Sequence, residues 1–502
     1  MVAVKTPDKK QQRKEIQTKK DMKLFKKIEL NKKIINDRIA ATVSYDVKVR
    51  EMNFGSKDVA FCYTNGLVDS SIMTSIMQVL PEVKREQLVP DTLKHFLETY
   101  FIHLSVEKVE TFDEAIDSML TGVVLVLIED EEIGLLIDAR EYPGRSPEEP
   151  DTERVVRGSR DGFVENILVN TALTRRRIRD ERLRMEMTQV GSRSKTDVCL
   201  AYLDDVADPG MVELLKARIK KIKVDGLPMA EKTVEEFIVR RNWHPYPMVR
   251  YTERPDVAAS HLLEGHVLVF VDTSPVAMIT PTTFFHHVQH AEEYRQIPIV
   301  GAYIRWVRFI GIFTSLFVLP IWMFYALNKG YLPAPLAFIG PKETGEIPIF
   351  WQFIFAELGI DLMRLAAVHT PTPLATAMGL VAAVLIGDVA ISVGLFMPET
   401  ILYLAVAAIG MFATPSYELG LANRLARLAL LATTFLFGIP GFMFGVTALI
   451  ILLASTTSLN TPYLWPFIPF NWTAMKHVLI RPAIPSLKHR PSIVHPQDDN
   501  RI

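Results

Sequence analysis

The sequence predicts an α/β cytosolic region, in which two small related α/β subdomains are joined by an Arg-rich helical linker, followed by an α-helical multi-pass transmembrane domain. Two observations support this fold class. Short apolar runs rich in Val, Ile and Leu alternate with helical patterns up to about residue 295. Beyond that point lie several uncharged runs, each long enough to cross a hydrocarbon layer of about 30 Å.

Composition narrows the classes of function. The chain of 502 residues is long enough for about three domains, and its net charge of −1 gives no bulk attraction to nucleic acid. Charge is unevenly distributed, because residues 1–38 hold 13 Lys and Arg against five Asp and Glu, whereas Leu428 to Met475 carries no charge. Cys62 and Cys199 lie in apolar runs, which indicates buried thiols in a reducing compartment and no disulfide framework.

Residues 1–40 are predicted to form a basic tail. Lysines alternate there with Ile and Leu, a pattern typical of a solvated tail and also of an amphipathic helix on anionic lipid. We favour the solvated tail. No motif for nucleic-acid binding accompanies the lysines, so no nucleic-acid partner is expected.

The first α/β subdomain is predicted over residues 41–140. Its helix and strand signals are separated by turn residues. The expected elements are a strand over 43–54, an apolar run over 58–67 that ends with the turn pair Asn65–Gly66, a helix over Val68–Leu80, helices with loops over Thr92–Leu120, and buried strands over Gly122–Ile128 and Gly134–Ala139.

The second α/β subdomain is predicted over residues 193–295 and resembles the first. Asp197–Tyr202 is similar to Asp58–Tyr63, and Gly265–Asp272 is similar to Gly122–Asp130. In addition, Asp69 and Asp208 fall at the same offset, each at the start of a helix. We interpret this as a tandem duplication. The alternative is two unrelated strand–helix pieces that share a β-branched composition.

Between the subdomains, residues 141–192 form the predicted linker. Its first half is rich in Pro, Gly and charge and is expected to be an exposed loop, whereas Asp161 to Met187 is expected to be a helix. That helix carries an arginine cluster, which could bind phosphate, acidic lipid or an acidic surface. We favour a solvated or inter-subunit face, and thus linker or inter-subunit contacts for Arg175, Arg176, Arg177 and Arg179.

The end of the soluble part carries a weak metal-like spacing. His286 and His290 are four residues apart, and Glu293 follows three residues later, so all three could face one side of a helix. No complete ligand set accompanies them, and no metal site or cofactor is predicted. We expect a helix at the membrane surface instead, with aromatic side chains at headgroup level, namely Tyr294, Tyr303 and Trp306.

The transmembrane domain is predicted over residues 296–475, with about 4–6 helical segments. Arg305 and Arg308 precede the first span and favour a cytosolic N-terminal region. Gly438 and its neighbours interrupt a long run, which is either one kinked helix or a hairpin of two half-helices. The expected segments are Phe309–Leu327, Pro348–Val368, Leu374–Pro398, Ile401–Tyr417, a cytosolic loop at Arg424 and Arg427, and Leu428–Ser455, followed by a basic Pro-rich tail over 476–502 that favours an even number of crossings.

Leu374–Pro398 holds one ionisable residue, Asp388, near the depth where a charge is most unfavourable. Such an acid indicates a pore or pathway, or alternatively a pair with an Arg or Lys of another subunit. The further pathway candidates are Gly387, Val384 and Ser392. Small residues at spacings of three and four share one side of the predicted helix and are expected to pack against neighbouring helices: Gly379, Ala383, Ala390 and Gly394.

Pro348–Val368 carries a second set of pathway candidates. Glu357, Asp361 and Arg364 are spaced four and then three residues apart, so they share one face of a helix that is otherwise apolar. A face of this kind belongs toward a bundle interior, a water-filled path or the membrane surface. Each acid could pair with Arg364 or with a neighbouring subunit.

Several motifs resemble the GerA family, the A subunits of bacterial spore germinant receptors. The most specific likeness is the linker EYPGRSPEEPDTERVVRGSRDGFVENILVNTALTRRRIRD. Pro281–Phe284, the acidic helix AELGIDLMR, the segment IGDVAI and the segment FATPSYELGLANR add to it. The resemblance covers nearly the whole chain beyond residue 40. His286, His287 and His290 depart from the family pattern, which argues further against a metal.

The resemblance implies a location in the inner membrane of the dormant spore and a role in germination. It also implies a ring-shaped homo-oligomer, a pentamer, that forms a nutrient-gated ion channel. Some relatives are expected to amplify germination together with a small membrane partner protein rather than to sense nutrients.

Three functional hypotheses remain open from the sequence. The first is an oligomeric channel for monovalent cations, because rings of Asp388, or of Glu357 and Asp361, would favour cations. The second is a membrane scaffold or signal relay, and the third is a carrier for a small anion such as dipicolinate, bound by Arg364. No nucleophile–base pair or phosphate-binding loop is present in the sequence, so an enzyme is not expected.

Overall fold

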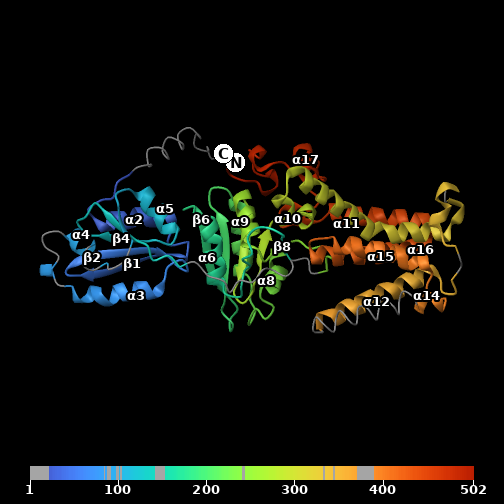
Figure 1. The fold of residues 1–502 in the computed structure, drawn as a ribbon, viewed down its shortest axis with the longest axis horizontal. Coiled ribbons are helices and arrows are strands. Elements are labelled where there is room, and N and C mark those ends of the chain that lie inside the picture. Colours follow the sequence, from blue (N-terminus) through green and yellow to red (C-terminus); the bar gives the residue numbers. More distant parts are fainter. Residues whose placement is uncertain are drawn as a thin grey trace. The chain divides into compact units, whose positions relative to one another are not determined.

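The computed structural model describes residues 22–501 except 84, 88–91, 98–100, 102–104, 142–152, 240–242, 332–333, 343–344 and 370–388. The chain forms two compact units, whose ribbons are shown in Figure 1. Unit 1 comprises Met1–Arg240, Tyr251–Pro281 and Lys488–Ile502, and unit 2 comprises Arg241–Arg250 and Thr282–Leu487.

Subdomain A, the first half of unit 1, is an antiparallel five-stranded sheet with helices on both faces (Figure 1). The strand order is β1-β2-β4-β5-β3. Along β2, Val59 and Phe61 face one core while Ala60 and Cys62 face the other, as the two-residue period of a strand requires. Its elements are α2 (Ile28–Ile39), β1 (Val47–Phe54), β2 (Lys57–Thr64), α3 (Ser70–Val79), α4 (Thr92–His95), β3 (Val106–Val109), α5 (Phe112–Leu120), β4 (Val124–Ile128) and β5 (Gly134–Ile137).

Subdomain B, the second half of unit 1, repeats this topology. Its strand order, β6-β7-β9-β10-β8, matches that of subdomain A when the strands are numbered from the start of each subdomain. The structure therefore agrees with the predicted duplication. Its elements are α6 (Ile167–Arg177), β6 (Leu183–Val190), β7 (Thr196–Leu203), α7 (Pro209–Lys220), α8 (Ala230–Val239), β8 (Arg250–Thr252), α9 (Pro255–Glu264), β9 (Val267–Val271) and β10 (Ala277–Thr280).

Equivalent aspartates begin the corresponding helices of the two subdomains, as the sequence predicted. The Asp69 carboxylate accepts a hydrogen bond of 2.7 Å from the Ser71 backbone N–H, and the Asp208 carboxylate accepts one of 3.0 Å from the Gly210 N–H. A side-chain acceptor at this position satisfies backbone donors that have no partner within the helix.

Three predicted elements were wrong. The basic tail does not extend to residue 40, because α2 packs Ile28, Ile35 and Ile39 into the core of subdomain A. The region 92–120 contains the edge strand β3, whose pairing with β5 decides its conformation. The linker helix ends at Arg177 rather than Met187, because Leu183 and Met185 alternate with polar residues and pair with β7.

Residues 488–501 return to unit 1 and pack on subdomain B. The Arg490 Nε donates to the Leu263 carbonyl at 2.9 Å, and the Gln497 amide donates to the Ala207 carbonyl at 2.7 Å. Val494 is buried beside Gly265, whose φ of +103° is unfavourable for any residue with a side chain and whose neighbours leave little space for one. We call residues 488–501 the C-terminal clasp; the prediction of a tail over 476–502 is wrong for this part.

Unit 2 is a helical bundle with a small strand pair, β11 (Thr457–Ser458) and β12 (Thr461–Pro462). Among the described residues, two helices are long and apolar enough to cross a membrane, α11 and α16, and α15 is apolar but shorter. The helices are α10 (Ala291–Arg295), α11 (Pro298–Leu327), α12 (Ile349–His369), α14 (Ala390–Ser392), α15 (Pro398–Phe412), α16 (Tyr417–Ala454) and α17 (Trp472–Leu479).

Helices α11, α15 and α16 of unit 2 lie side by side (Figure 1). α11 and α15 run antiparallel, since Gly311 meets Gly410 at one end and the Trp322 ring stacks on Tyr403 at the other. We call the Gly311 end the base and the Trp322 end the tip. α12 starts at the tip, because the Gln352 side chain accepts a hydrogen bond of 2.9 Å from the Met397 N–H just before α15.

α16 is a hairpin, one of the two alternatives that the sequence left open. Gly438 has φ +61° and ψ −136°, which breaks the helix. The position of a Cβ on Gly445 would lie 2.8 Å from Thr433 Oγ1, whereas 12 residues of straight helix would separate them by about 18 Å. The chain therefore turns at Gly438, and its second arm packs antiparallel to the first.

Candidate functional site

Glu357 is the centre of a buried charge cluster in unit 2. Its carboxylate oxygens lie 2.9 Å from the Arg424 guanidinium and 2.6 Å from the Arg427 guanidinium. Arg424 also pairs with Asp361, and Arg427 donates to the Ser315 carbonyl of α11. We call Glu357, Asp361, Arg424 and Arg427 the charge cluster; it holds two carboxylates and two guanidiniums, so its formal charges cancel.

Helix periodicity builds the cluster from two segments far apart in sequence. Glu357 and Asp361 are four residues apart on α12, and Arg424 and Arg427 are three apart on α16, so each pair shares one face of its helix. Farther along, the Phe350 and Phe435 rings stack with centroids 4.5 Å apart. Ionic contact and stacking together fix the register of α12 against the first arm of α16.

The two acids of the cluster differ in exposure. The Glu357 side chain is only 3% exposed, whereas the Asp361 side chain is 39% exposed. The neighbours of Asp361 on α12 are apolar and exposed, namely Leu358, Leu362 and Leu365. A carboxylate on such a surface requires water or a protein partner, because lipid cannot solvate it.

Arg364 does not join the cluster. Its guanidinium contacts the Met411 Sδ at 3.2 Å and lies 5.7 Å from the centroid of the Tyr417 ring. The arginines that pair with the acids, Arg424 and Arg427, were assigned to a cytosolic loop, and that assignment was wrong. They are buried within α16, where Glu357 offsets the unfavourable transfer of their charge.

The second predicted pathway lies mostly outside the described residues. This applies to Asp388, Gly387, Val384, Gly379 and Ala383. Of the remaining candidates, Ala390 is buried in the short helix α14, the exposed Ser392 hydroxyl donates to the Val389 carbonyl, and Gly394 follows with φ +76°. Their predicted roles in the pathway and in helix packing stay predictions.

The arginine cluster of the linker contains one fully buried member, Arg175. Its Nε lies 2.9 Å from an Asp46 carboxylate oxygen of subdomain A, and its remaining donors reach the Asp180 and Leu183 carbonyls. Arg175 therefore joins the two subdomains within one chain. Arg176 and Arg179 are exposed at the surface of the described part of subdomain B.

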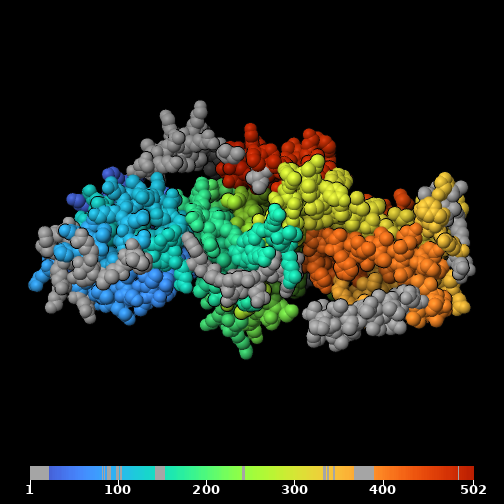
Figure 2. All heavy atoms as spheres, in the orientation of Figure 1, coloured from blue at the N-terminus to red at the C-terminus, as the bar shows by residue number. Residues whose placement is uncertain are grey.

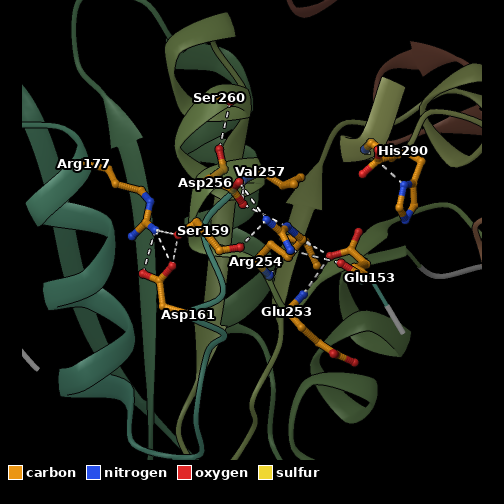
Figure 3. Close-up of polar contacts among 12 residues, drawn as sticks. Glu153, Ser159, Asp161, Arg177, Glu253, Arg254, Asp256, Val257, Ser260 and His290 are labelled. Carbon is orange, nitrogen blue, oxygen red and sulfur yellow. Dashed lines mark hydrogen bonds and ion pairs between the residues drawn. The ribbon is translucent and has the colours of Figure 1, made fainter. Parts of the chain in front are cut away.

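Arg177 and Arg254 hold Asp161 and Ser159 of the predicted linker, residues 141–192, against subdomain B (Figure 3). Arg177 donates to Asp161 at 2.6 Å, and Arg254 donates to the Ser159 carbonyl at 3.0 Å. Burial alone would raise the pKa of the Asp161 carboxyl, but hydrogen bonds from Arg177 and Ser159 outweigh it and lower this pKa below its ordinary value. The second half of the linker motif is thus a structural contact.

The histidines before the bundle cap short helices. The backbone N–H of Thr283 donates to the His286 ring, and that of Glu292 donates to the His290 ring, as drawn for His290 in Figure 3. Glu293 is buried and pairs with Arg305 at 2.7 Å and with Arg308. Within the described ranges, no group of three His, Cys, Asp or Glu residues is arranged to hold a metal.

Comparison with known proteins decides the family. Residues 33–493 match the family model described as Bacillus/Clostridium GerA spore germination protein. This chain belongs to the GerA family. The motifs that resembled GerA proteins, above all the linker, therefore predicted the family correctly.

Individual GerA relatives match over most of their length. Stage V sporulation protein AF of Bacillus subtilis (strain 168) is 56% identical over 468 residues, which cover 93% of this chain and 95% of that protein. Spore germination protein GerLA of Bacillus cereus is 30% identical, covering 90% and 93%. The N-terminal domain of the A subunit of the Bacillus megaterium spore germinant receptor GerK3 is 24% identical, with a TM-score of 0.41 and coverage of 53% and 98%.

Proposed function

We propose that this GerA-family chain is a multi-pass protein of the spore inner membrane, and that several copies, as a pentamer, surround a path for monovalent cations that amplifies germination. The observation that carries the proposal is the half-exposed Asp361 carboxylate on the otherwise apolar outer face of α12. The pair with Arg424 leaves the Asp361 side chain 39% exposed, and that exposed part would be disfavoured if it faced lipid. Facing a wet axis between copies, it would be hydrated and would attract cations.

The helix directions support an even number of crossings. α12 and α15 both run from tip to base. α11 is antiparallel to α15, and the first arm of α16 is antiparallel to α12, so both of these run from base to tip. The chain leaves unit 1 before α11 and rejoins it at the C-terminal clasp. If unit 2 spans the bilayer, both connections lie on one side, and Arg305 and Arg308 near the base favour the cytosolic side.

The outer surface of the bundle is apolar, as expected for a surface that lipid or another protein covers. α15 is visible in orange on the drawn face of Figure 2. Large apolar side chains of this helix are exposed, among them Leu402, Ile409 and Phe412. A surface of this kind is rare on a monomer in water and requires lipid or other subunits to cover it.

A non-conducting scaffold is the second candidate, and the enclosure of Glu357 favours it. Between two arginines, this acid serves packing rather than conduction. We therefore assign the ion-facing role to Asp361 and leave Glu357 as a positioning residue that holds α12 in register. A small membrane partner protein would be needed by either candidate for full activity.

The test is conductance of the purified full chain in liposomes, together with its small membrane partner. Asp361→Asn should lower the permeability ratio of K⁺ to Cl⁻ by roughly fivefold, since a charge 4 Å from an ion in water contributes about 1 kcal/mol. Asp498→Asn, which removes a carboxylate of the clasp, serves as the matched control and should leave selectivity unchanged. Absence of conductance from protein shown to be assembled would favour the scaffold.

A further inference from the structure

The segment between β12 and α17 is unusually aromatic for an exposed loop. It reads Trp465-Pro466-Phe467-Ile468-Pro469-Phe470-Asn471 and leads into Trp472. Phe467, Phe470 and Trp472 are 56%, 64% and 57% exposed. Three aromatic side chains turned outward within six residues are disfavoured in water, so an apolar layer is expected to cover them.

The backbone of this loop is suited to a poorly hydrated layer. The N–H groups of Phe467 and Ile468 both donate to the Leu464 carbonyl, and the N–H of Asn471 donates to the Pro466 carbonyl. Pro466 and Pro469 have no N–H to satisfy. Non-helical backbone is better tolerated at the edge of a membrane when its polar groups are paired, and most N–H groups of this loop are.

Two arginine contacts fix α17 beside the beginning of α11. The Arg305 guanidinium donates to the His477 and Val478 carbonyls at 2.8 and 2.9 Å, which satisfies the last carbonyls of α17. Arg305 lies next to Trp306, which is exposed, as is Tyr303. The aromatic loop is therefore held at the base of unit 2, where α11 enters its apolar stretch.

Polar groups complete the pattern of a headgroup-level element. The Lys476 ammonium lies 5.4 Å from the centroid of the Trp472 ring, so a cation sits beside the aromatic group. Tryptophan and tyrosine prefer the boundary between headgroups and acyl chains, and lysine stems extend from there toward phosphate. Asn471 caps α17 through the Ala474 N–H at 3.1 Å.

We propose that residues 465–479 form an interfacial anchor that binds the phospholipid headgroup layer at the base of unit 2. Phe467 and Phe470 reach the upper acyl chains, and Trp472 and Lys476 lie at headgroup level. This inference rests on the proposed membrane span of α11 and α16 and adds a lipid-binding element outside those helices. Because α17 is bonded to Arg305, the anchor sets the depth at which α11 begins.

The test uses nitroxide labels on the full chain in vesicles of phosphatidylglycerol and phosphatidylethanolamine. Cys62 and Cys199 are buried, so introduced cysteines take the label. The test positions are Phe467→Cys and Phe470→Cys. Phe444→Cys on the exposed face of α16 is the lipid control, and Met229→Cys in unit 1 is the aqueous control. Collisions with lipid-soluble oxygen and with a water-soluble nickel chelate are measured at each position.

The expected oxygen-to-nickel collision ratio at 467 and 470 falls between those of 444 and 229, nearer to that of 444. A ratio at 467 equal to that at 229 overturns the anchor, because the loop is then in water. Low collision rates with both reagents also overturn it, since the loop is then covered by protein, such as a second copy. A nickel-dominated signal at 444 contradicts the membrane span instead, while the signal at 467 still decides the anchor.

Discussion

The two units each bury a guanidinium, but they stabilise it in different ways. Arg175 in unit 1 has one carboxylate, Asp46, and completes its bonding with backbone carbonyls of Asp180 and Leu183, which follow the end of α6. Arg424 and Arg427 in unit 2 instead share the carboxylate of Glu357, and each also donates to one helical carbonyl, that of Glu357 and that of Ser315 respectively. In unit 1 the acceptors are the carbonyls of a loop residue, Asp180, and of the first residue of the edge strand β6, Leu183. The interior of a helical bundle offers fewer such acceptors, because most helical carbonyls are already bonded.

The stability of the charge cluster therefore depends mainly on the balance of its charged side chains. The stability of buried Arg175, between the two subdomains, depends more on the backbone carbonyls beside it. Removing one partner from a buried ion pair leaves an uncompensated charge and is more harmful than removing both. We expect the effect to be larger in unit 2, where two guanidiniums share the carboxylate of Glu357. Three substitutions test this ordering.

The largest effect is expected for Glu357→Ala, which leaves the buried Arg427 without a carboxylate partner and Arg424 with Asp361 alone. The free energy of unfolding should fall by about 4 kcal/mol, as for other buried pairs that lose one partner. Denaturant unfolding of the full chain in mild detergent measures it. Glu357→Gln is the matched control. Its free energy of unfolding should fall by less, because the amide oxygen can still accept a hydrogen bond from one arginine. A loss below about 1 kcal/mol for the alanine variant would show that water reaches the cluster.

A smaller loss is expected for Arg175→Ala. The Asp46 carboxylate stays buried without its partner, but water can occupy the vacated space at the junction of the soluble subdomains, so a loss of about 3 kcal/mol is expected. Urea unfolding followed by a probe in unit 1 measures it. The exposed neighbour Arg176→Ala should change stability by less than about 0.5 kcal/mol. Equal losses for the two variants would contradict the assigned role of Arg175.

The smallest effect is expected at the linker contact of Asp161 with Arg177. Because the pKa of Asp161 is lowered in the folded state, its contribution is present above the unfolded pKa of about 3.9 and is lost as pH falls through the folded value. The group is only partly buried, so the contribution should be below about 1 kcal/mol. Unfolding free energies at pH 5 and pH 3 should differ less in Asp161→Asn than in the parent chain. An unchanged difference would show that the contact of Asp161 with Arg177 does not contribute to stability.

Sequence reasoning predicted the soluble sheets well because their strands are local patterns. The apolar runs at β2, β4, β7 and β9 each match one strand, and Asp69 and Asp208 begin the expected helices. Errors arose where tertiary pairing overrides the local pattern. In the edge strand β3 only Val109 is fully buried, so its apolar pattern is weak. In α2 the many lysines suggested a solvated tail, although its isoleucines form an apolar stripe that packs on the sheet.

Of the four residues in the charge cluster, only the two acids were predicted as site residues. Glu357 and Asp361 were visible as charges in an apolar helix, but their partners lie more than 60 residues later and looked like a loop between spans. The signal that could have identified these partners is the spacing of Arg424 and Arg427, which lie three residues apart in a helix that begins at Tyr417 after the cap residue Ser416. Pairing of distant segments is decided by packing, which one sequence does not display.

The C-terminal clasp implies an order of events during synthesis. Subdomain B leaves the ribosome early, yet the surface formed by Ala207, Leu263 and Gly265 receives its cover only after every helix of unit 2 has been made. Until residues 488–501 emerge, Val494 is missing from its place beside Gly265. Subdomain B therefore stays incomplete until a segment that follows the whole helical bundle has been made.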